Sequence, residues 1–307
     1  MTPQLITTLG PRTADEVGTI LPHEHVFVDL RTWDQPGYAD ADPADVVALM
    51  APEIERARAA GVGAIVEAST VGVGRRVDIL RAVSEATAFP IVVPTGIYRE
   101  PWIPRWAHEA SEDDLATWMA RELDVGIEDS DVRAGWIKLS AGDDGLTQTE
   151  TKILRAAGRA ARATNAVIGS HTIRGGVVQE QLEILGRVGH PPERFVWIHT
   201  QAEPDSALHL DVARRGAWIE YDAVGADDIA DEYFLDRIRA ALDAGLGGRV
   251  LLSQDRGSYD PAQPGGGTPR PYTYLLDTFV PKLRVAGVDD PTITILTAGN
   301  PFAAFAR

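Results

Sequence analysis

Short runs of apolar residues, rich in Val and Ile, recur along the chain between longer segments with helical spacing. The runs are continuously apolar rather than alternating, which is typical of parallel strands covered on both faces. We predict a β-strand for each of eight runs: Thr19–Leu30, Ala64–Ser69, Ile91–Gly96, Ala134–Leu139, Ala166–Ser170, Phe195–His199, Ala217–Tyr221 and Arg249–Gln254.

The segments between these strands predict helices that cover the sheet. In Glu150–Arg162, for example, Ile153, Leu154 and Ala157 form an apolar side and the basic residues are left for solvent. The expected helices are Pro43–Ala60, Arg75–Thr87, Ser111–Gly126, Thr147–Thr164, Gly176–Val188, Asp205–Arg215 and Asp228–Ala244, with Tyr272–Arg307 as the last helix and a tail. Strands that each precede a helix, without a change of composition, favour one α/β domain over residues 1–307, a (β/α)8 TIM barrel.

A doubly wound sheet is the competing architecture. It requires a glycine-rich phosphate loop after an early strand. Gly72 and Gly74 lack the third glycine of that loop, because position 77 is Val77. The longest irregular stretch is Arg256–Pro271, and a loop of that length inside a compact domain is commonly a lid.

Composition restricts the partners and the chemistry. The chain has 307 residues, 44% of them hydrophobic, and 29 Lys and Arg against 45 Asp and Glu give a net charge of −16. Such an acidic surface disfavours nucleic acid and anionic lipid. The absence of cysteine excludes disulfides, thiolate nucleophiles and cysteine-ligated metals. The first residues do not read as a signal peptide, and no apolar run reaches about 18 residues. We therefore expect a cytoplasmic protein with no nucleic-acid or membrane partner, and a homodimer is left open.

Polar side chains with metal-binding chemistry occur where the predicted strands end. The first strand carries His23 and His25, whose side chains point the same way, whereas Glu24 should point towards the barrel wall. Later strands end near Lys138, His171, His199 and Asp255. Because the carboxyl ends of barrel strands meet at one rim, these side chains should converge there.

Each of these residues also has a simpler interpretation. Lys138 could extend to water or pair with Asp255. A lone histidine such as His171 or His199 is often a hydrogen-bonded core or rim residue. The regular placement of all of them favours a shared site. The remaining histidines, His108, His190 and His209, fall outside this pattern, and we expect them on the solvent side.

Neutral imidazoles and a carboxylate are good ligands for Zn²⁺ and similar divalent ions. The ammonium of Lys138 would repel a metal, but a neutral lysine amine can capture CO2 as a carbamate that bridges two ions. Two metals about 3.5–4 Å apart would share a hydroxide that attacks the substrate. Asp255 could bind one metal and accept the proton of that hydroxide.

These residues resemble the phosphotriesterase family of the amidohydrolase superfamily over nearly the full chain. The matching stretches are LPHEH, RARAAGVGAIVEAST, IVVPTGIY, GIEDSDVRAGWIKLS, SHT, WIHT, LLSQD, FVPKLRVAGV and GNP. The resemblance implies that His23, His25 and Asp255 bind the more buried metal. It also implies that His171 and His199 bind the other metal and that a carboxylated Lys138 lies between them.

The resemblance adds Tyr98 to the catalytic candidates, because it looks like the tyrosine that lactonase members place near the bridging hydroxide. Its alternative role is packing on Pro101 and Trp102. The loops after His199 and after the seventh and eighth strands depart from the family pattern. Since loops form the pocket, these departures bear on the substrate.

We expect a lactone or other carboxylic ester as the small-molecule substrate. The alternative is an organophosphate triester hydrolase (aryldialkylphosphatase), which would need an apolar pocket, with Trp102 and Trp106 as nearby candidates. An alternative of another class is a non-catalytic binding protein on an inherited barrel, but the complete ligand set argues against it.

The loop Arg256–Pro271 supplies the candidate substrate contacts Arg256, Tyr259 and Arg270, and Gly265–Gly267 could act as a hinge. Guanidinium groups beside a metal site suit a polar or anionic substrate, because arginine offers paired donors to carboxylate or phosphate. Alternatively, both arginines are solvated surface charges.

Overall fold

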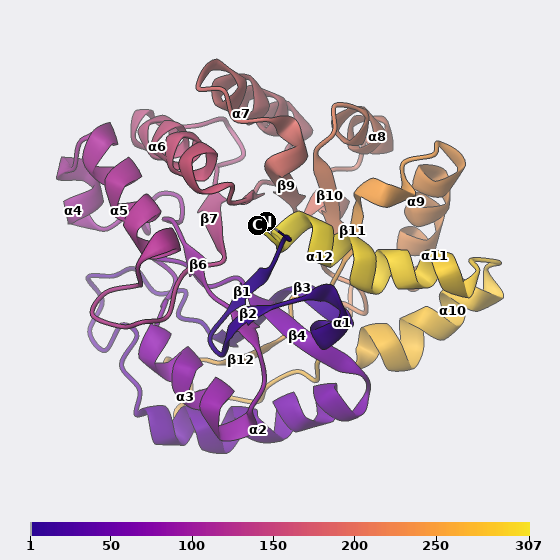
Figure 1. Ribbon diagram of the computed structural model, residues 1–307, viewed down its shortest axis with the longest axis horizontal. Coiled ribbons are helices and arrows are strands. Elements are labelled where there is room, and N and C mark those ends of the chain that lie inside the picture. Colours follow the sequence, from indigo (N-terminus) through magenta and orange to yellow (C-terminus); the bar gives the residue numbers. More distant parts are fainter. Residues whose placement is uncertain (1) are drawn as a thin grey trace.

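Parallel strands form the centre of the fold, and helices surround them (Figure 1). The computed structural model describes residues 2–307. The eight predicted strands are all present, so the (β/α)8 barrel is confirmed. They are β3 (Thr19–Phe27), β4 (Val62–Glu67), β5 (Ile91–Val92) continued by β6 (Pro94–Thr95), β7 (Trp136–Ser140), β8 (Ile168–His171), β9 (Phe195–Ile198), β10 (Trp218–Tyr221) and β11 (Val250–Leu252).

The helices predicted between the strands are also present. They are α2 (Pro43–Ala59), α3 (Val77–Thr87), α5 (Glu112–Asp124), α6 (Gln148–Thr164), α7 (Gly175–Arg187), α8 (Ser206–Arg214) and α9 (Asp231–Asp243). Side-chain caps determine several starts: Asp42 accepts a hydrogen bond from Ala44 N–H, and Thr147 accepts one from Glu150 N–H. Within residues 2–307, no helix is long and apolar enough to cross a membrane.

The region Tyr272–Arg307 contains two helical stretches rather than the one helix expected. The first runs from a π-helical turn at Leu275–Phe279 into α10 (Val280–Val285), and the second runs from α11 (Asp290–Thr294) through a π-helical turn at Ile295–Gly299 into α12 (Asn300–Phe305). Each of α10, α11 and α12 has a proline in its first turn, and in α10 and α12 the helix continues through it from the preceding π-helical turn. The break between the two stretches follows Val285, where Gly287 has a φ angle of +90° and ends the helix.

Five short α-helices and β-strands were not predicted. They are the hairpin strands β1 (Leu5–Thr7) and β2 (Gly10–Arg12), the helices α1 (Ala14–Val17) and α4 (Arg105–Glu109), and the strand β12 (Gly257–Tyr259). All are too short to show a hydrophobic period. The presence of β12 also corrects the expectation that Arg256–Pro271 is wholly irregular, since β12 pairs in parallel with β3.

The barrel closes where its last strand meets its first. One ladder has the order β11-β10-β9-β8-β7-β6 and the other β12-β3-β4-β5. The two ladders meet at two junctions. The first is at Val93, between β5 and β6, and the second is between β11 and β12. At the second junction, Asp255 N–H donates to the His23 carbonyl at 3.3 Å, and His25 N–H donates to the Arg256 carbonyl at 3.0 Å. The residues of the candidate metal site therefore lie directly on this closure.

The interior of the barrel is apolar at one end and polar at the other. Alternation along β7 places Trp136 and Lys138 inside, with the Lys138 amine 5.7 Å from the Trp136 ring centroid. Below them, the Phe305 ring of α12 packs edge-on against Trp136 with centroids 5.2 Å apart. Figure 1 shows α12 crossing near the centre of the strands, where the two chain ends lie together. The C-terminal helix therefore closes the apolar end.

Replacing Phe305 with alanine should destabilise the fold strongly, because the ring is fully buried between α12 and the barrel interior. We expect a loss of about 3–5 kcal/mol in the free energy of unfolding, measured by urea denaturation. Phe302 of the same helix is only half-buried. Phe302→Ala is thus the matched control, with a smaller expected loss, and equal losses would contradict this account of the barrel floor.

Candidate metal centre

Three candidate ligands meet at the junction of the first and last strands. His23 and His25 extend from β3, and Asp255 follows β11. An Asp255 carboxylate oxygen, Oδ1, lies 3.1 Å from Nε2 of His25 and 3.6 Å from Nε2 of His23. One potential ligand atom from each residue lies within 4.8 Å of the other two. This spacing suits a single metal ion.

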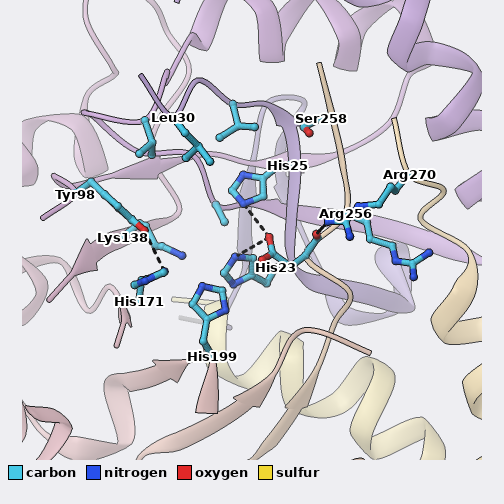
Figure 2. Close-up of a pocket in the computed structure, with 14 residues that line it drawn as sticks. His23, His25, Leu30, Tyr98, Lys138, His171, His199, Arg256, Ser258 and Arg270 are labelled. Carbon is cyan, nitrogen blue, oxygen red and sulfur yellow. Dashed lines mark hydrogen bonds and ion pairs between the residues drawn. The ribbon is translucent and has the colours of Figure 1, made fainter. Parts of the chain in front are cut away.

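The other candidates border the same cavity, whose volume is about 310 Å³ (Figure 2). The His171 and His199 ring centroids are 4.4 Å apart, and the His199 centroid is 5.1 Å from that of His23. Lys138 is buried among them. Burial lowers the pKa of its amine to about 8, although Glu220 and Asp255 oppose that shift. The structure thus brings together all six residues predicted from the strand ends.

Buried acceptors orient three of the imidazoles. Nδ1 of His23 lies 3.1 Å from Glu220, Nδ1 of His25 lies 2.8 Å from the Ser69 hydroxyl, and Nδ1 of His199 lies 2.7 Å from Asp222. When Nδ1 of a histidine is held in this way, Nε2 is left to bind a metal. The donor set therefore fits divalent metal ions.

Four carboxyl groups are buried beneath this donor set. The carboxylates of Glu24, Glu67, Glu220 and Asp222 are fully buried close to Asp255. Burial and the neighbouring Asp222 raise the pKa of Glu220 well above its usual value. Burial would lower the pKa of His25, but hydrogen bonds to Asp255 and Glu67 outweigh it and raise that pKa to about 9. A divalent cation would offset the repulsion among these carboxylates.

Three of these carboxylates were not foreseen from the sequence. Glu67, Glu220 and Asp222 stand in or next to apolar strands, in the segments IVE and WIEYD. An acidic residue within an apolar strand is costly to bury, unless hydrogen bonds or a metal compensate for it. That signal could have identified them.

The proposed substrate contacts are divided between the cavity and the core. Arg256 and Arg270 line the cavity, whereas Tyr259 does not. The Tyr259 ring instead stacks on Phe27 with centroids 5.8 Å apart. Alternation along β12 explains this difference, because the preceding residue, Ser258, lines the cavity in place of Tyr259.

Tyr98 lies at the edge of the histidine group. Its hydroxyl is 3.1 Å from Nδ1 of His171, and its ring packs edge-on against Trp102 at 5.5 Å. Both expected roles, packing and proximity to the site, are thus compatible with its position. Among the histidines outside the site, His108 is exposed as expected.

The expectation that His190 and His209 face solvent is wrong. Both side chains are buried. His209 is held between the Tyr221 hydroxyl at 3.1 Å and the Glu203 carbonyl at 2.9 Å. His190 lies 2.9 Å from the Arg194 carbonyl. Local hydrogen bonds therefore make these polar rings compatible with burial.

A (β/α)8 barrel with imidazoles and a carboxylate gathered at the C-terminal ends of its strands has the architecture of a metal-dependent hydrolase. Comparison with known proteins identifies its family. A family model described as the phosphotriesterase family matches residues 3–305. The chain belongs to the phosphotriesterase family and is a hydrolase of ester bonds.

The relatives cover nearly the whole chain. A phosphotriesterase homology protein of Escherichia coli K12 is 29% identical over 296 residues, covering 95% of this chain and 99% of the relative. An aryldialkylphosphatase of Saccharolobus solfataricus is 26% identical over 298 residues, covering 93% and 94%. A solved structure of a variant PTE-like lactonase from Deinococcus radiodurans superposes with a TM-score of 0.85 at 29% identity, covering 98% and 99%.

Removing divalent metal with a chelator should lower the melting temperature, because ions that bind only the folded state stabilise it. An ion present at 1,000 times its dissociation constant contributes about 4 kcal/mol. Differential scanning calorimetry before and after chelation measures this shift. Asp255→Asn should respond less to chelation than wild type. Identical wild-type melting temperatures with and without metal would contradict a metal centre.

Proposed function

We propose that the protein is a binuclear metal-dependent hydrolase that opens lactones or other carboxylic esters, with a preference for polar or anionic substrates. The observation that carries this proposal is the convergence of His23, His25, Lys138, His171, His199 and Asp255 on one cavity. No cysteine is available as a competing nucleophile or ligand. The family membership supports hydrolysis as the reaction.

In this proposal, the six residues hold two divalent metal ions, with zinc as the first choice. His23, His25 and Asp255 hold one ion, His171 and His199 hold the other, and a carbamate on Lys138 lies between them. Such ions would lower the pKa of a water molecule and polarise the carbonyl or phosphoryl oxygen of the substrate. Burial lowers the pKa values of His23 and His171, which favours the neutral imidazoles that bind metal at these two positions.

The surroundings of Lys138 support the carbamate. An unmodified ammonium would repel the two cations, whereas a carbamate would carry one negative charge and two oxygen ligands. Carbamate formation needs the neutral amine, and a pKa of about 8 makes that form accessible near neutral pH. The main chain also approaches closely here, because a Cβ on Gly96 would lie 2.2 Å from the Lys138 carbonyl. The position of Lys138 is therefore tightly constrained.

Asp255 and Tyr98 are the proposed catalytic residues. The Asp255 side chain is about one-third exposed (35%) and so remains open to the cavity, where it can accept a proton from the attacking water. The pKa of Asp255 is well below its usual value, because its hydrogen bond to His25 and the neighbouring histidines outweigh the effect of burial. The Tyr98 hydroxyl can donate a hydrogen bond to the substrate beside His171.

The two sides of the cavity differ in character. Val28, Leu30 and Val73 supply apolar surface, and Arg256 and Arg270 supply positive charge. Figure 2 shows Leu30 and Tyr98 on one side of the histidines and both arginines on the other. Burial lowers the pKa of Arg256, and the positive charge of the nearby Arg270 lowers it further. An anionic group between them would relieve this repulsion, which favours a small substrate with one apolar and one anionic end.

Organophosphate triesters are the second candidate, because a relative is named an aryldialkylphosphatase. The aromatic pocket that would favour such substrates is not formed by Trp102 or Trp106, neither of which borders the cavity. Trp106 packs on Trp118 instead. A non-catalytic binding protein is the third candidate. A panel of anionic lactones, neutral lactones, carboxylic esters and phosphotriesters, compared by kcat/KM with metal added, tests all three.

Lys138→Ala should lose nearly all hydrolytic activity, because no other residue is proposed to lie between the two metals. Acetate, propionate or bicarbonate should restore part of the activity if a carbamate is the missing group. Lys152 bonds to the carbonyls of Ala107, His108 and Ala110, away from the cavity. Lys152→Ala should therefore remain active. An unmodified Lys138 in a crystal structure with both metals bound would exclude the carbamate.

Arg256→Ala should raise KM more for anionic than for neutral lactones, while kcat changes little for either. The side chain contacts only the pocket wall, where it bonds to the Gly225 carbonyl and lies 5.0 Å from the Tyr274 ring centroid. Its backbone N–H survives the substitution. Steady-state kinetics on matched anionic and neutral lactones measure the difference. Equal losses, or a wild-type preference for long acyl chains, would overturn the anionic preference.

A further inference from the structure

Asp255 has a backbone conformation that rarely occurs without a specific cause. Its φ angle is +51°, in the left-handed region, and it is followed by Gly257 and Ser258 with φ angles of +87° and +72°. Residues other than glycine rarely adopt the left-handed conformation, because their Cβ atom comes too close to the following carbonyl oxygen. The conformation turns the chain out of β11 and directs the Asp255 carboxylate towards His23 and His25. Interactions around Asp255 must therefore hold it.

Glu24 supplies these interactions from the opposite strand. Its carboxylate accepts a hydrogen bond from Gln254 N–H at 3.0 Å and another from Arg256 N–H at 2.7 Å. These two N–H groups flank Asp255 on either side. Oε1 of Glu24 accepts from Gln254 N–H and Oε2 accepts from Arg256 N–H. The Glu24 side chain therefore holds the backbone on both sides of Asp255.

The side chain of Glu24 is committed to this position. It is fully buried, does not line the cavity, and accepts a further hydrogen bond from the Ser253 hydroxyl at 2.8 Å. That hydroxyl in turn accepts a hydrogen bond from His23 N–H at 3.0 Å. The expectation that Glu24 points away from the metals therefore agrees with its position. Its partners are the backbone and side chains of the last strand.

We propose that Glu24 is a positioning residue that fixes the left-handed backbone of Asp255 and thereby sets the geometry of the metal held by His23, His25 and Asp255. The proposal rests on the metal centre described above, but not on its substrate. Because β3 carries both histidines and Glu24, one strand would supply two ligands directly and position the third. The competing explanation is that Glu24 only closes the barrel and contributes stability.

The two explanations differ in what Glu24→Gln does to metal binding. Glutamine has nearly the same shape, but it replaces one acceptor oxygen with an N–H2 donor. One of the two N–H groups that flank Asp255 then loses its acceptor. Substitutions outside the ligand set typically weaken metal affinity about 10- to 100-fold. We expect a loss of this size for one of two bound Co²⁺ ions, with the other unaffected. Co²⁺ titration of the metal-depleted protein, followed by visible absorption against a competing chelator, measures both affinities.

A double-mutant cycle tests whether Glu24 acts through Asp255. Asp255→Asn should weaken the same Co²⁺ ion. If Glu24 acts by positioning Asp255, Glu24→Gln should have little further effect in the Asp255→Asn background. Independent, multiplicative losses of Co²⁺ affinity would overturn the proposal and leave Glu24 with a purely structural role.

Glu122→Gln is the matched control. Glu122 is a buried acid that bonds to Arg75 and Thr95, away from the cavity. It should lower the melting temperature without changing either Co²⁺ affinity. If Glu24→Gln does not fold, Glu24→Asp retains the carboxyl group but shortens its reach, and the same selective loss is expected. Two Co²⁺ ions in wild type with unchanged affinities in a folded Glu24 variant would overturn this proposal alone. A wild-type protein that binds no Co²⁺ would overturn the metal centre as well.

Discussion

The closure of the barrel between its first and last strands is the constraint on which the candidate metal centre depends. The regular ladder does not continue through this junction, since β11 ends at Leu252 and β12 begins at Gly257. Individual hydrogen bonds bridge the gap: the Ser253 hydroxyl donates to the Glu24 carboxylate, and Asp255 N–H donates to the His23 carbonyl. The interruption frees Asp255 from the strand and lets its carboxylate turn towards the histidines. A continuous ladder would hold that residue in an extended conformation.

Buried negative charge is the second constraint, and it explains why the polar residues occupy only one end of the barrel. A buried carboxylate is stable when hydrogen bonds or cations replace its lost hydration. Glu67 accepts from the N–H groups of Val26 and Ser69, and Asp222 accepts from the N–H and the ring of His199. These bonds satisfy individual oxygens but bring no positive charge that would balance the whole group. A pair of divalent ions would offset much of the negative charge, and the apolar end beneath Trp136 needs no such compensation.

The sequence predicted the barrel strands and all six candidate ligands, because both depend on strand ends that are visible as apolar runs. It did not predict features that depend on contacts across the fold. The direction of Tyr259 follows from the pairing of β12 with β3, which no local pattern indicates. His209 is buried because Tyr221 and Glu203 bring partners to it from other segments. The break between the two helical stretches of the last region, by contrast, could have been predicted from Gly287, because a glycine in the left-handed conformation commonly ends a helix.

The strands carry most of the candidate metal ligands and the loops carry most of the cavity wall, which determines how the substrate preference of this barrel could change. The histidines and Lys138 belong to strands or their ends. The apolar residues of the cavity lie after β3 (Val28 and Leu30) and after β4 (Val73), whereas the arginines lie after β11 and β12. Arg256 does not fit this separation between metal-binding strands and substrate-facing loops, because it directly follows the candidate ligand Asp255. Its backbone N–H is bonded to Glu24, but its side chain extends along the cavity wall to Gly225 and Tyr274. The backbone at this position is therefore fixed by the metal centre, while the side chain remains free to vary with the substrate.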